Sequence, residues 1–458
     1  MVNERPALVT GLTSDVPWPG LSPFREEDAS FFHGRNEDVR ETLRLVKREP
    51  LTVFFGRSGI GKTSLLFAGL FPRLRADGFF PVRVRLDFLP DAPQLSDQVL
   101  EALRFEAQRD GIDMPPAAEA TSLWEYFHNV ETEFWSSRNE LLIPVLVFDQ
   151  FEEVLSLGQG GERVHRARTS EFLSELGDLI ENRPPEHVRS AANDDPKIVT
   201  RFDFRRVPYR VILSFREEHL ADFEHLRREI PSFQSPNRLR LLPMTWDQAI
   251  AAVITTGGHL VDSEVATRIV DVAAGVGHAD RAGLTIEPVF LSLICYQLNE
   301  SRRRRGLPRI TAELIVEAGG EIVSDFYERE MSQFNAHVRS FLEECLITEA
   351  GQRNSVVVDD AVRFPGVDHD VLMRLVDHRV LRMDQRLGVN RVELIHDVLV
   401  PVLRSSRDRR TIEQRRQQVE RAEMEAVSGV QRRRRRFRIA VVMMMLAVIA
   451  MVAWMLRK

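Results

Sequence analysis

A glycine-rich segment in the first quarter of the chain has the spacing of a phosphate-binding loop. It reads Gly56-Arg-Ser-Gly-Ile-Gly-Lys-Thr63 and lies between an apolar run, 51–55, and a helix-like stretch, 64–70. A strand that turns through glycines into a helix directs backbone N–H groups and the positive end of the helix dipole at one point, where a phosphate binds. We expect Lys62 to contact the β- and γ-phosphates and Thr63 to bind Mg²⁺. The predicted nucleotide-binding residues of this segment are Gly56, Ser58, Gly59, Gly61, Lys62, Thr63 and Ser64.

An acidic segment further along the chain predicts the other half of the site. Asp149-Gln-Phe-Glu-Glu153 directly follows the apolar run Leu141–Phe148. Such a run is typical of a buried parallel strand, and ligands bind at the carboxyl ends of parallel strands. We expect Asp149 to hold Mg²⁺ and either Glu152 or Glu153 to polarise the attacking water. The alternatives are an acidic helix N-cap here and an ordinary strand-to-helix turn at the glycine-rich segment.

The residue after the predicted magnesium ligand bears on the rate of hydrolysis. Gln150 follows Asp149 directly, at a position where many fast ATPases carry a catalytic glutamate. An amide does not accept a proton as a carboxylate does. We therefore expect slow turnover, as in a switch rather than a motor.

The composition is that of a globular protein of two or three domains. The chain has 458 residues, of which 43% are hydrophobic and 28% charged, an ordinary balance. Its 62 Lys and Arg against 68 Asp and Glu leave a net charge of −6, which gives no reason to expect a nucleic-acid partner. Cys295 and Cys345 lie in apolar helical patterns, so we expect core thiols in a reducing compartment, with neither a disulfide framework nor a metal cluster. The N-terminal residues lack the apolar core of a secretion signal.

The last part of the sequence predicts a membrane span. Ile439–Leu456 carries no charged side chain, and at 1.5 Å per residue it covers about 27 Å, close to the thickness of a bilayer core. Arg432–Arg436 precede it, and the positive-inside bias keeps the N-terminal side in the cytoplasm. We expect a single-pass transmembrane helix over 437–456, in contact with membrane lipid; the alternative is a buried core helix or an aggregation-prone tail.

The first half of the chain alternates short apolar runs with helical patterns. Such alternation predicts an α/β fold with a doubly wound parallel sheet. We assign this domain to residues 34–240, after an N-terminal lead over 1–33. The expected strands are Leu51–Phe55, Val82–Leu86, Val145–Phe148 and Arg210–Phe215.

Helical spacing dominates the second half. Thr245-Trp-Asp-Gln248 is a capping-box signature that opens a helical lid subdomain over 241–330. Arg302–Arg305 near the end of its last strong helical pattern are interpreted as a solvated cap favoured by the helix dipole, rather than as a nucleic-acid patch.

The remaining segments predict a small domain and a stalk. Residues 331–402 read as two helices followed by two strands, Val380–Met383 and Arg391–Ile395, which resembles a winged helix. Residues 403–436 are highly charged, with sparse apolar positions. That pattern indicates an exposed helical stalk or a weak coiled coil.

These motifs together resemble the STAND class of signal-transduction ATPases, in the group called novel STAND NTPase 1. The resemblance covers about 20–407 and includes Pro19-Gly-Leu-Ser-Pro-Phe-Arg-Glu-Glu-Asp-Ala-Ser-Phe-Phe-His-Gly-Arg-Asn-Glu37, the phosphate loop and the acidic segment. It implies that Arg35, in the Gly-Arg element, binds nucleotide. It also implies that Arg216, which closes Val211-Ile-Leu-Ser-Phe-Arg216, lies near the γ-phosphate; the alternative is one more surface arginine.

The resemblance further implies a latched switch. Pro288 resembles a lid proline that packs on the nucleotide base, although Ile286 stands where the family usually has glycine. His396 resembles a winged-helix histidine that contacts the β-phosphate of ADP. ADP would then hold a closed form, and exchange for ATP, bound with Mg²⁺, would release it for homo-oligomerisation.

The leading hypothesis is therefore a membrane-anchored, slow ATPase switch, bacterial by analogy, in a stress or defence response. Relatives often carry a large repeat domain that senses a ligand, so we expect a separate sensor or effector protein. Two alternatives stay open. One is an origin-recognition-like or regulator-like ATPase whose winged helix binds DNA, although Val371–Val380 is a poor groove reader. The other is a non-hydrolysing nucleotide-binding scaffold.

Overall fold

The computed structural model describes most of the chain. The described residues are 11–88, 92–116, 122–154, 163–194, 200–223, 226–227, 230–274, 284–318, 322–348, 351–378, 380–386, 389–395, 399–412, 415–416, 441–451 and 455. His396 lies outside these ranges, as do most of the predicted stalk and parts of the predicted span 437–456.

A parallel sheet forms the centre of the first domain, as the sequence predicts. A short strand, β3 (Phe134–Trp135), pairs antiparallel with β4 (Leu141–Phe148). The parallel strands are, in spatial order, β2 (Phe79–Val84), β4 (Leu141–Phe148), β5 (Arg210–Arg216), β1 (Leu51–Gly56) and β6 (Arg238–Arg240).

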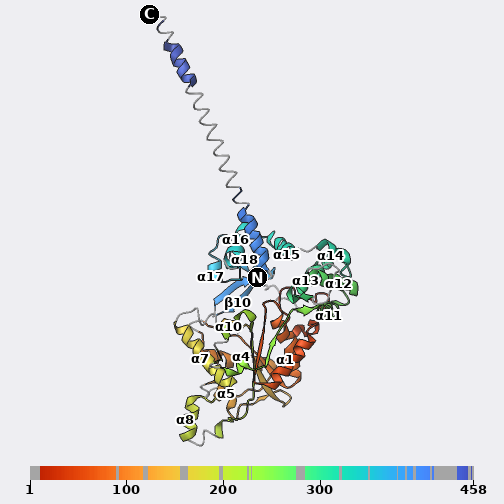
Figure 1. Ribbon diagram of the computed structural model, residues 1–458, viewed down its shortest axis with the longest axis vertical. Helices are drawn as coiled ribbons and strands as arrows, with labels where there is room; N and C mark the ends of the chain where they lie inside the picture. The colour runs from red at the N-terminus through yellow and green to blue at the C-terminus, as the bar shows by residue number, and fades with distance from the viewer. Residues whose placement is uncertain are drawn as a thin grey trace, which may run out of the picture.

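Helices cover both faces of this sheet (Figure 1). Successive side chains of a strand point to opposite faces, and those of β4 do so: Val145 and Val147 belong to one core, Leu146 and Phe148 to the other. One face packs on α1 (Asn36–Arg48), the π-helical turn η2 (Leu65–Leu70) and α3 (Phe71–Ala76), and the short helix α2 (Lys62–Ser64) leads into η2. The other packs on α4 (Leu95–Asp110), α5 (Leu123–His128), α7 (Arg163–Ile180) and α10 (Leu220–Phe223). The helix α8 (Glu186–Asp194) contributes Val188 to a separate small cluster.

One strand prediction needs correction, and one strand of the parallel sheet was not predicted. The strand expected over Val82–Leu86 is β2, which runs from Phe79 to Val84. The sequence reading also missed β6, because its alternation of Arg238, Leu239 and Arg240 has only one apolar side chain. That is enough for an edge strand, which needs burial on less of its surface.

The second half of the chain is mainly helical and shares one core. Its helices and the lead residues Trp18 and Leu21 pack together. They are α11 (Trp246–Gly257), α12 (Ser263–Ala274), α13 (Pro288–Arg304), α14 (Ala312–Ala318), α15 (Ile322–Met331), α16 (Ala336–Cys345), α17 (Val358–Ala361) and α18 (His369–Asp377), with a two-stranded pair of β7 (Met244–Thr245) and β8 (Thr285–Ile286).

A small antiparallel sheet lies against α17 and α18. Its order is β10 (Leu381–Arg386), β11 (Val389–Leu394) and β9 (Ser355–Val357). Two of these strands correspond to those predicted for a winged helix, and β9 was not predicted. We call this unit the C-terminal sheet.

The chain after the C-terminal sheet continues as a helix over residues 399–412. Leu403 is buried, and Arg410 forms an ion pair with Glu343 of α16 at 2.8 Å. The beginning of the predicted stalk is therefore packed onto the body of the protein. Residues 441–451 are helical with exposed apolar side chains, and within the described ranges no helix combines the length and apolarity needed to cross a bilayer.

Asn237 joins the phosphate-loop strand to its neighbours. Its amide nitrogen lies 2.7 Å from the Leu51 carbonyl and 3.1 Å from that of Leu45, while its oxygen accepts from Arg48 Nε at 3.0 Å. The residue is 1% exposed. This side chain thus satisfies buried backbone groups at the start of β1 and the end of α1.

We expect Asn237→Ala to lower the free energy of unfolding by about 2–3 kcal/mol, because buried partners lose their hydrogen bonds. Urea titration measures the change. Asn36→Ala, at an exposed position on α1, is the control and should change stability by less than about 0.5 kcal/mol. Equal effects of the two substitutions would contradict this role of Asn237.

Candidate nucleotide-binding site

The phosphate loop begins where β1 ends at the carboxyl edge of the sheet. Gly59 and Gly61 have φ angles of +79° and +91°, a region that favours glycine. A Cβ on Gly56 would lie 2.7 Å from the carbonyl oxygen of Leu241, so the first glycine is required by close packing. The glycine pattern therefore has a structural reason at each of these three positions.

Two cations hold the loop in this shape. Lys62 Nζ donates to the carbonyl oxygens of Gly56 and Arg57 at 2.8 and 2.9 Å. Arg35 is buried at the start of α1 and donates to the Ile60 carbonyl at 3.2 Å, while pairing with Asp38 at 3.1 Å. Arg35 therefore contacts the loop backbone, and Lys62 lies where it can exchange carbonyl partners for phosphate oxygens.

Asp149 lies at the carboxyl end of β4, between two hydroxyl groups. Thr63 Oγ1 donates to Asp149 Oδ2 at 2.8 Å, and Ser214 Oγ of β5 donates to Oδ1 at 2.9 Å. A hydroxyl and a carboxylate are the oxygen ligands that Mg²⁺ prefers in phosphate sites, where phosphate and water complete the coordination. Among the residues that the structure describes, no three His, Cys, Asp or Glu side chains cluster as a metal site. The Thr63–Asp149 pair therefore fits a magnesium ion that is bound together with a nucleotide.

The two glutamates of the acidic segment face different cavities. Glu152 lines the same cavity as Lys62, whereas Glu153 lines a smaller neighbouring one. Glu152 is 8% exposed and pairs with Arg216 Nε at 3.2 Å, and its other carboxylate oxygen has no hydrogen-bond partner. Burial raises the pKa of Glu152 above its ordinary value, although Arg216 acts in the opposite direction. Of the two, Glu152 is placed to accept a proton from water in the main cavity.

Gln150 adopts a conformation that is uncommon for a residue other than glycine. Its φ angle is +63°, and it lines the main cavity directly after Asp149. Left-handed backbone costs a non-glycine residue about 1–2 kcal/mol. The turn from β4 into the acidic segment is thus held by its surroundings, including the hydrogen bond from Phe151 N to Ser214 O at 2.8 Å.

The main cavity has a volume of about 640 Å³ and is bounded by four parts of the chain. This volume is within the usual range for ligand pockets. The phosphate loop and acidic segment form its base, with Pro288 at the first turn of α13 and the lead as two further walls. Arg353 and the C-terminal sheet form the fourth wall, to which that sheet contributes Arg382 and Met383.

The lead is one part of the site that the sequence did not predict, and the pair Arg353 and Arg382 is another. Phe24 N donates to Ser64 Oγ at 3.1 Å, so this hydroxyl contacts the lead. Residues 20–27 line the cavity, and Trp18 and Leu21 are buried. The available signal was the unusual density of aromatic and proline residues in Trp18-Pro-Gly-Leu-Ser-Pro-Phe24, which is hard to reconcile with a solvated tail.

The predicted residues come together to a large extent. Around the main cavity lie Arg35, Ser58, Gly59, Gly61, Lys62, Thr63, Ser64, Asp149, Glu152, Arg216 and Pro288. Gly56 shapes the loop from beneath, Glu153 faces the neighbouring cavity, and His396 is outside the described residues.

Comparison with known proteins identifies a family. The model of the family Novel STAND NTPase 1 matches residues 17–433. No curated protein gives a significant match.

Solved structures give distant likenesses. Cdc6p from Pyrobaculum aerophilum is 15% identical with a TM-score of 0.37, covering 81% of this chain and 92% of that one. The ORC2 protein of Aeropyrum pernix is 13% identical with a TM-score of 0.40, again covering 81% and 92%. A Walker-type ATPase of Pyrococcus abyssi is 16% identical with a TM-score of 0.38, covering 84% and 99%. Likenesses of this size carry no functional information.

Thr63 and Ser64 are adjacent hydroxyls with different partners, which gives a matched test. We expect Thr63→Ala to remove most of the Mg²⁺ dependence of nucleotide binding, because the hydroxyl beside Asp149 is lost. Ser64→Ala should leave the Mg²⁺ dependence intact, since its hydroxyl contacts Phe24. Titration with fluorescent ADP, with and without Mg²⁺, measures both. The same loss of Mg²⁺ dependence in the two variants would contradict the assignment.

Proposed function

The chain belongs to the Novel STAND NTPase 1 family, and from that premise we propose that it is a nucleotide-dependent switch that binds ATP and ADP with Mg²⁺. In this proposal ATP hydrolysis is slow and resets the switch. The resting form holds ADP, and the ATP-bound form self-associates. Family membership supports the nucleoside triphosphatase class, and the geometry of the main cavity supports the switch.

The observation that carries this proposal is that the phosphate loop shares a cavity with the lead, α13 and the C-terminal sheet. A nucleotide bound to Lys62 and Thr63 would lie among all four. Its phosphates and base would then contribute free energy to keeping these parts together. A ligand shifts a conformational equilibrium only through such differential contacts.

The fourth wall is basic, which suits a phosphate-sensing role. Arg353 and Arg382 both pair with Glu393 of β11, so two positive charges share one carboxylate. Arg353 also donates to the Leu394 carbonyl at 3.1 Å, just before His396 in the sequence. We propose that His396, as the family resemblance implies, adds a contact to the β-phosphate of ADP and so latches the closed form.

Membrane anchoring is part of the same proposal. The apolar sequence 439–456 after an arginine cluster supports it, as do the exposed apolar side chains of Val442 and Ile449. The nucleotide-binding domain would then lie in the cytoplasm at the membrane surface. Self-association of the ATP form would bring several such segments together, with a separate protein acting as sensor or effector.

The first test is the nucleotide that co-purifies with the protein. We expect bound ADP on a monomer, and assembly after exchange into a non-hydrolysable ATP analogue. Mass spectrometry of the extracted nucleotide and light scattering measure these. Lys62→Ala should weaken nucleotide binding at least about tenfold, a loss of about 1.4 kcal/mol or more. An empty site in the unmodified protein, or assembly that is the same with ADP and with the ATP analogue, would contradict the proposal.

The two glutamates allow a test of the hydrolysis step. We expect Glu152→Gln to lower kcat for ATP by about 10²-fold or more, the usual contribution of a general base. Glu153→Gln, which makes the same chemical change beside the neighbouring cavity, should alter kcat less than about threefold. Phosphate release under saturating ATP measures both. The reverse order would assign the water-activating role to Glu153.

A further inference from the structure

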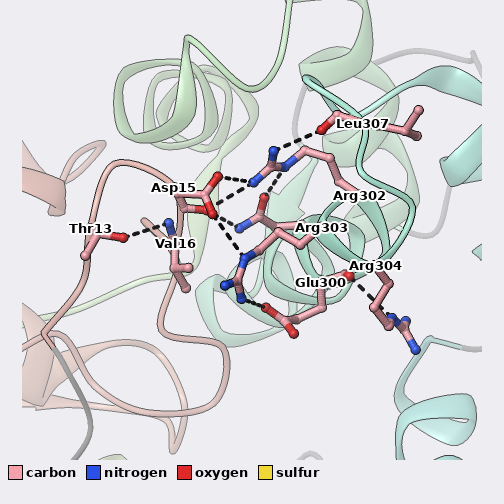
Figure 2. A network of polar contacts seen from close by, with 9 residues as sticks. Thr13, Asp15, Val16, Glu300, Arg302, Arg303, Arg304 and Leu307 are labelled. Atoms are coloured by element: carbon pink, nitrogen blue, oxygen red, sulfur yellow. Dashed lines mark hydrogen bonds and ion pairs between the residues drawn. The ribbon is translucent and has the colours of Figure 1, made fainter.

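A network of polar contacts fastens the start of the lead to the end of α13 (Figure 2). Thr13 and Val16 exchange backbone hydrogen bonds of 3.2 and 2.9 Å, which closes a tight turn around Asp15. The Asp15 carboxylate accepts from Arg302 and, at 3.1 Å, from Arg303 Nε. The Asp15 carbonyl accepts from Asn299 Nδ2 at 2.8 Å. Both the side chain and the backbone of Asp15 are therefore held; we call this set of contacts the Asp15 clamp.

The interpretation of Arg302–Arg305 as a solvated cap is wrong for Arg302, which is buried. Its side chain is only 7% exposed, compared with 45% for Arg303. It also donates to Asn299 Oδ1 at 2.7 Å and to the Leu307 carbonyl at 3.0 Å. A buried guanidinium needs a counter-charge as well as hydrogen bonds, and Asp15 provides the carboxylate in this structure.

From the clamp the lead crosses two helices of the lid. Trp18 packs so closely on α11 that a Cβ on Gly257 would lie 2.2 Å from its ring, and Gly20 lies against Tyr296 of α13. Further along, the Phe31 carbonyl accepts from Thr256 Oγ1 at 2.9 Å. These contacts tie the lead to the lid at several points beyond Asp15.

The lead also reaches the phosphate-loop helix. Phe24 N donates to Ser64, and Glu26 pairs with Arg75 of α3 at 2.5 Å. The residues between Gly20 and Glu27 line the main cavity. The lead therefore bridges the lid and the sheet domain and encloses the cavity between its two attachments. A segment with these contacts must move for that wall of the cavity to open.

We propose that Asp15, through Arg302 and Arg303, positions the lead as a movable wall of the nucleotide cavity and so controls the rates of nucleotide entry and release. This inference rests on the proposed function, because it needs a nucleotide in the cavity. Asp15 acts at a distance from the phosphates, through the lead. Opening the clamp leaves Lys62, Thr63 and Asp149 in place, so it changes both rates more than it changes the equilibrium.

The test uses Asp15→Asn in the full-length protein, an exposed substitution that keeps the size of the side chain. We expect association and dissociation rates of fluorescent ADP to rise together by about tenfold, as expected for loss of about 1.4 kcal/mol of closing free energy. The dissociation constant should change less than about threefold. Arg303→Gln, which leaves Arg302 paired with Asp15, should give an intermediate increase. A merely structural role would weaken affinity without accelerating association.

Glu300→Gln is the matched control. Glu300 pairs with Arg303 at 2.9 Å on the same helix, and the substitution makes the same charge change without touching the lead. Both rates should stay within about twofold of the unmodified protein. Accelerated exchange in this variant would assign the effect to the charge of α13 and overturn the proposal.

Limited trypsin digestion provides a readout that needs no nucleotide. Arg25 lies within the lead with a side chain that is 68% exposed, and cleavage requires the local segment to open. We expect Asp15→Asn to be cleaved there several times faster. Unchanged cleavage and unchanged exchange rates would contradict the clamp alone. Failure of the unmodified protein to bind nucleotide would contradict the proposed function, and the gate with it.

Discussion

The candidate site depends on the register of three neighbouring parallel strands. Gly56, the last residue of β1, pairs with Arg216, the last residue of β5, and Phe148 of β4 pairs with Leu213. This register brings the phosphate loop, Asp149 and Arg216 to one edge of the sheet. Because a shift of one residue turns every side chain to the other face, the buried cores on both sides fix the register. Hydrogen bonds from Thr63 and Ser214 to Asp149 then join the three strand ends.

The sheet accounts for one side of the cavity, and the other sides come from parts of the chain that are distant in sequence. The lead and α13 meet through Asp15 and Arg302, which are 287 residues apart. The C-terminal sheet contributes Arg382, and a loop before it contributes Arg353. The cavity therefore exists only when parts of the chain that are distant in sequence are in contact. Binding of a ligand in this cavity is therefore coupled to the packing of those parts against one another.

Local sequence patterns predicted the local half of this site. The signals for these features lie within a few residues of each other in the sequence. They are the glycines of the phosphate loop, the apolar run before Asp149 and the apolar runs of the main parallel strands. The burial of Arg302 and the different directions of Glu152 and Glu153 depend on packing partners far away in the sequence. The local sequence therefore indicated a solvated cap for the arginines and did not distinguish the two glutamates. The short strands β6 and β9 were missed because each has only three residues, too few for a periodic signal, and pairing with a neighbouring strand defines them.

The pairing of Arg216 with Glu152 would link the strength of the proposed general base to the nucleotide that is bound. While Arg216 is bound to Glu152, its positive charge is compensated and the carboxylate is a weaker proton acceptor. A γ-phosphate near Arg216 would compete for the guanidinium, since phosphate offers more charge and can accept two parallel hydrogen bonds from it. Glu152, buried and with a raised pKa, would then be the stronger base. ADP has no γ-phosphate with which to compete. On this argument the ion pair would keep Glu152 the weaker base until a γ-phosphate takes over Arg216, so that a triphosphate would prepare its own hydrolysis.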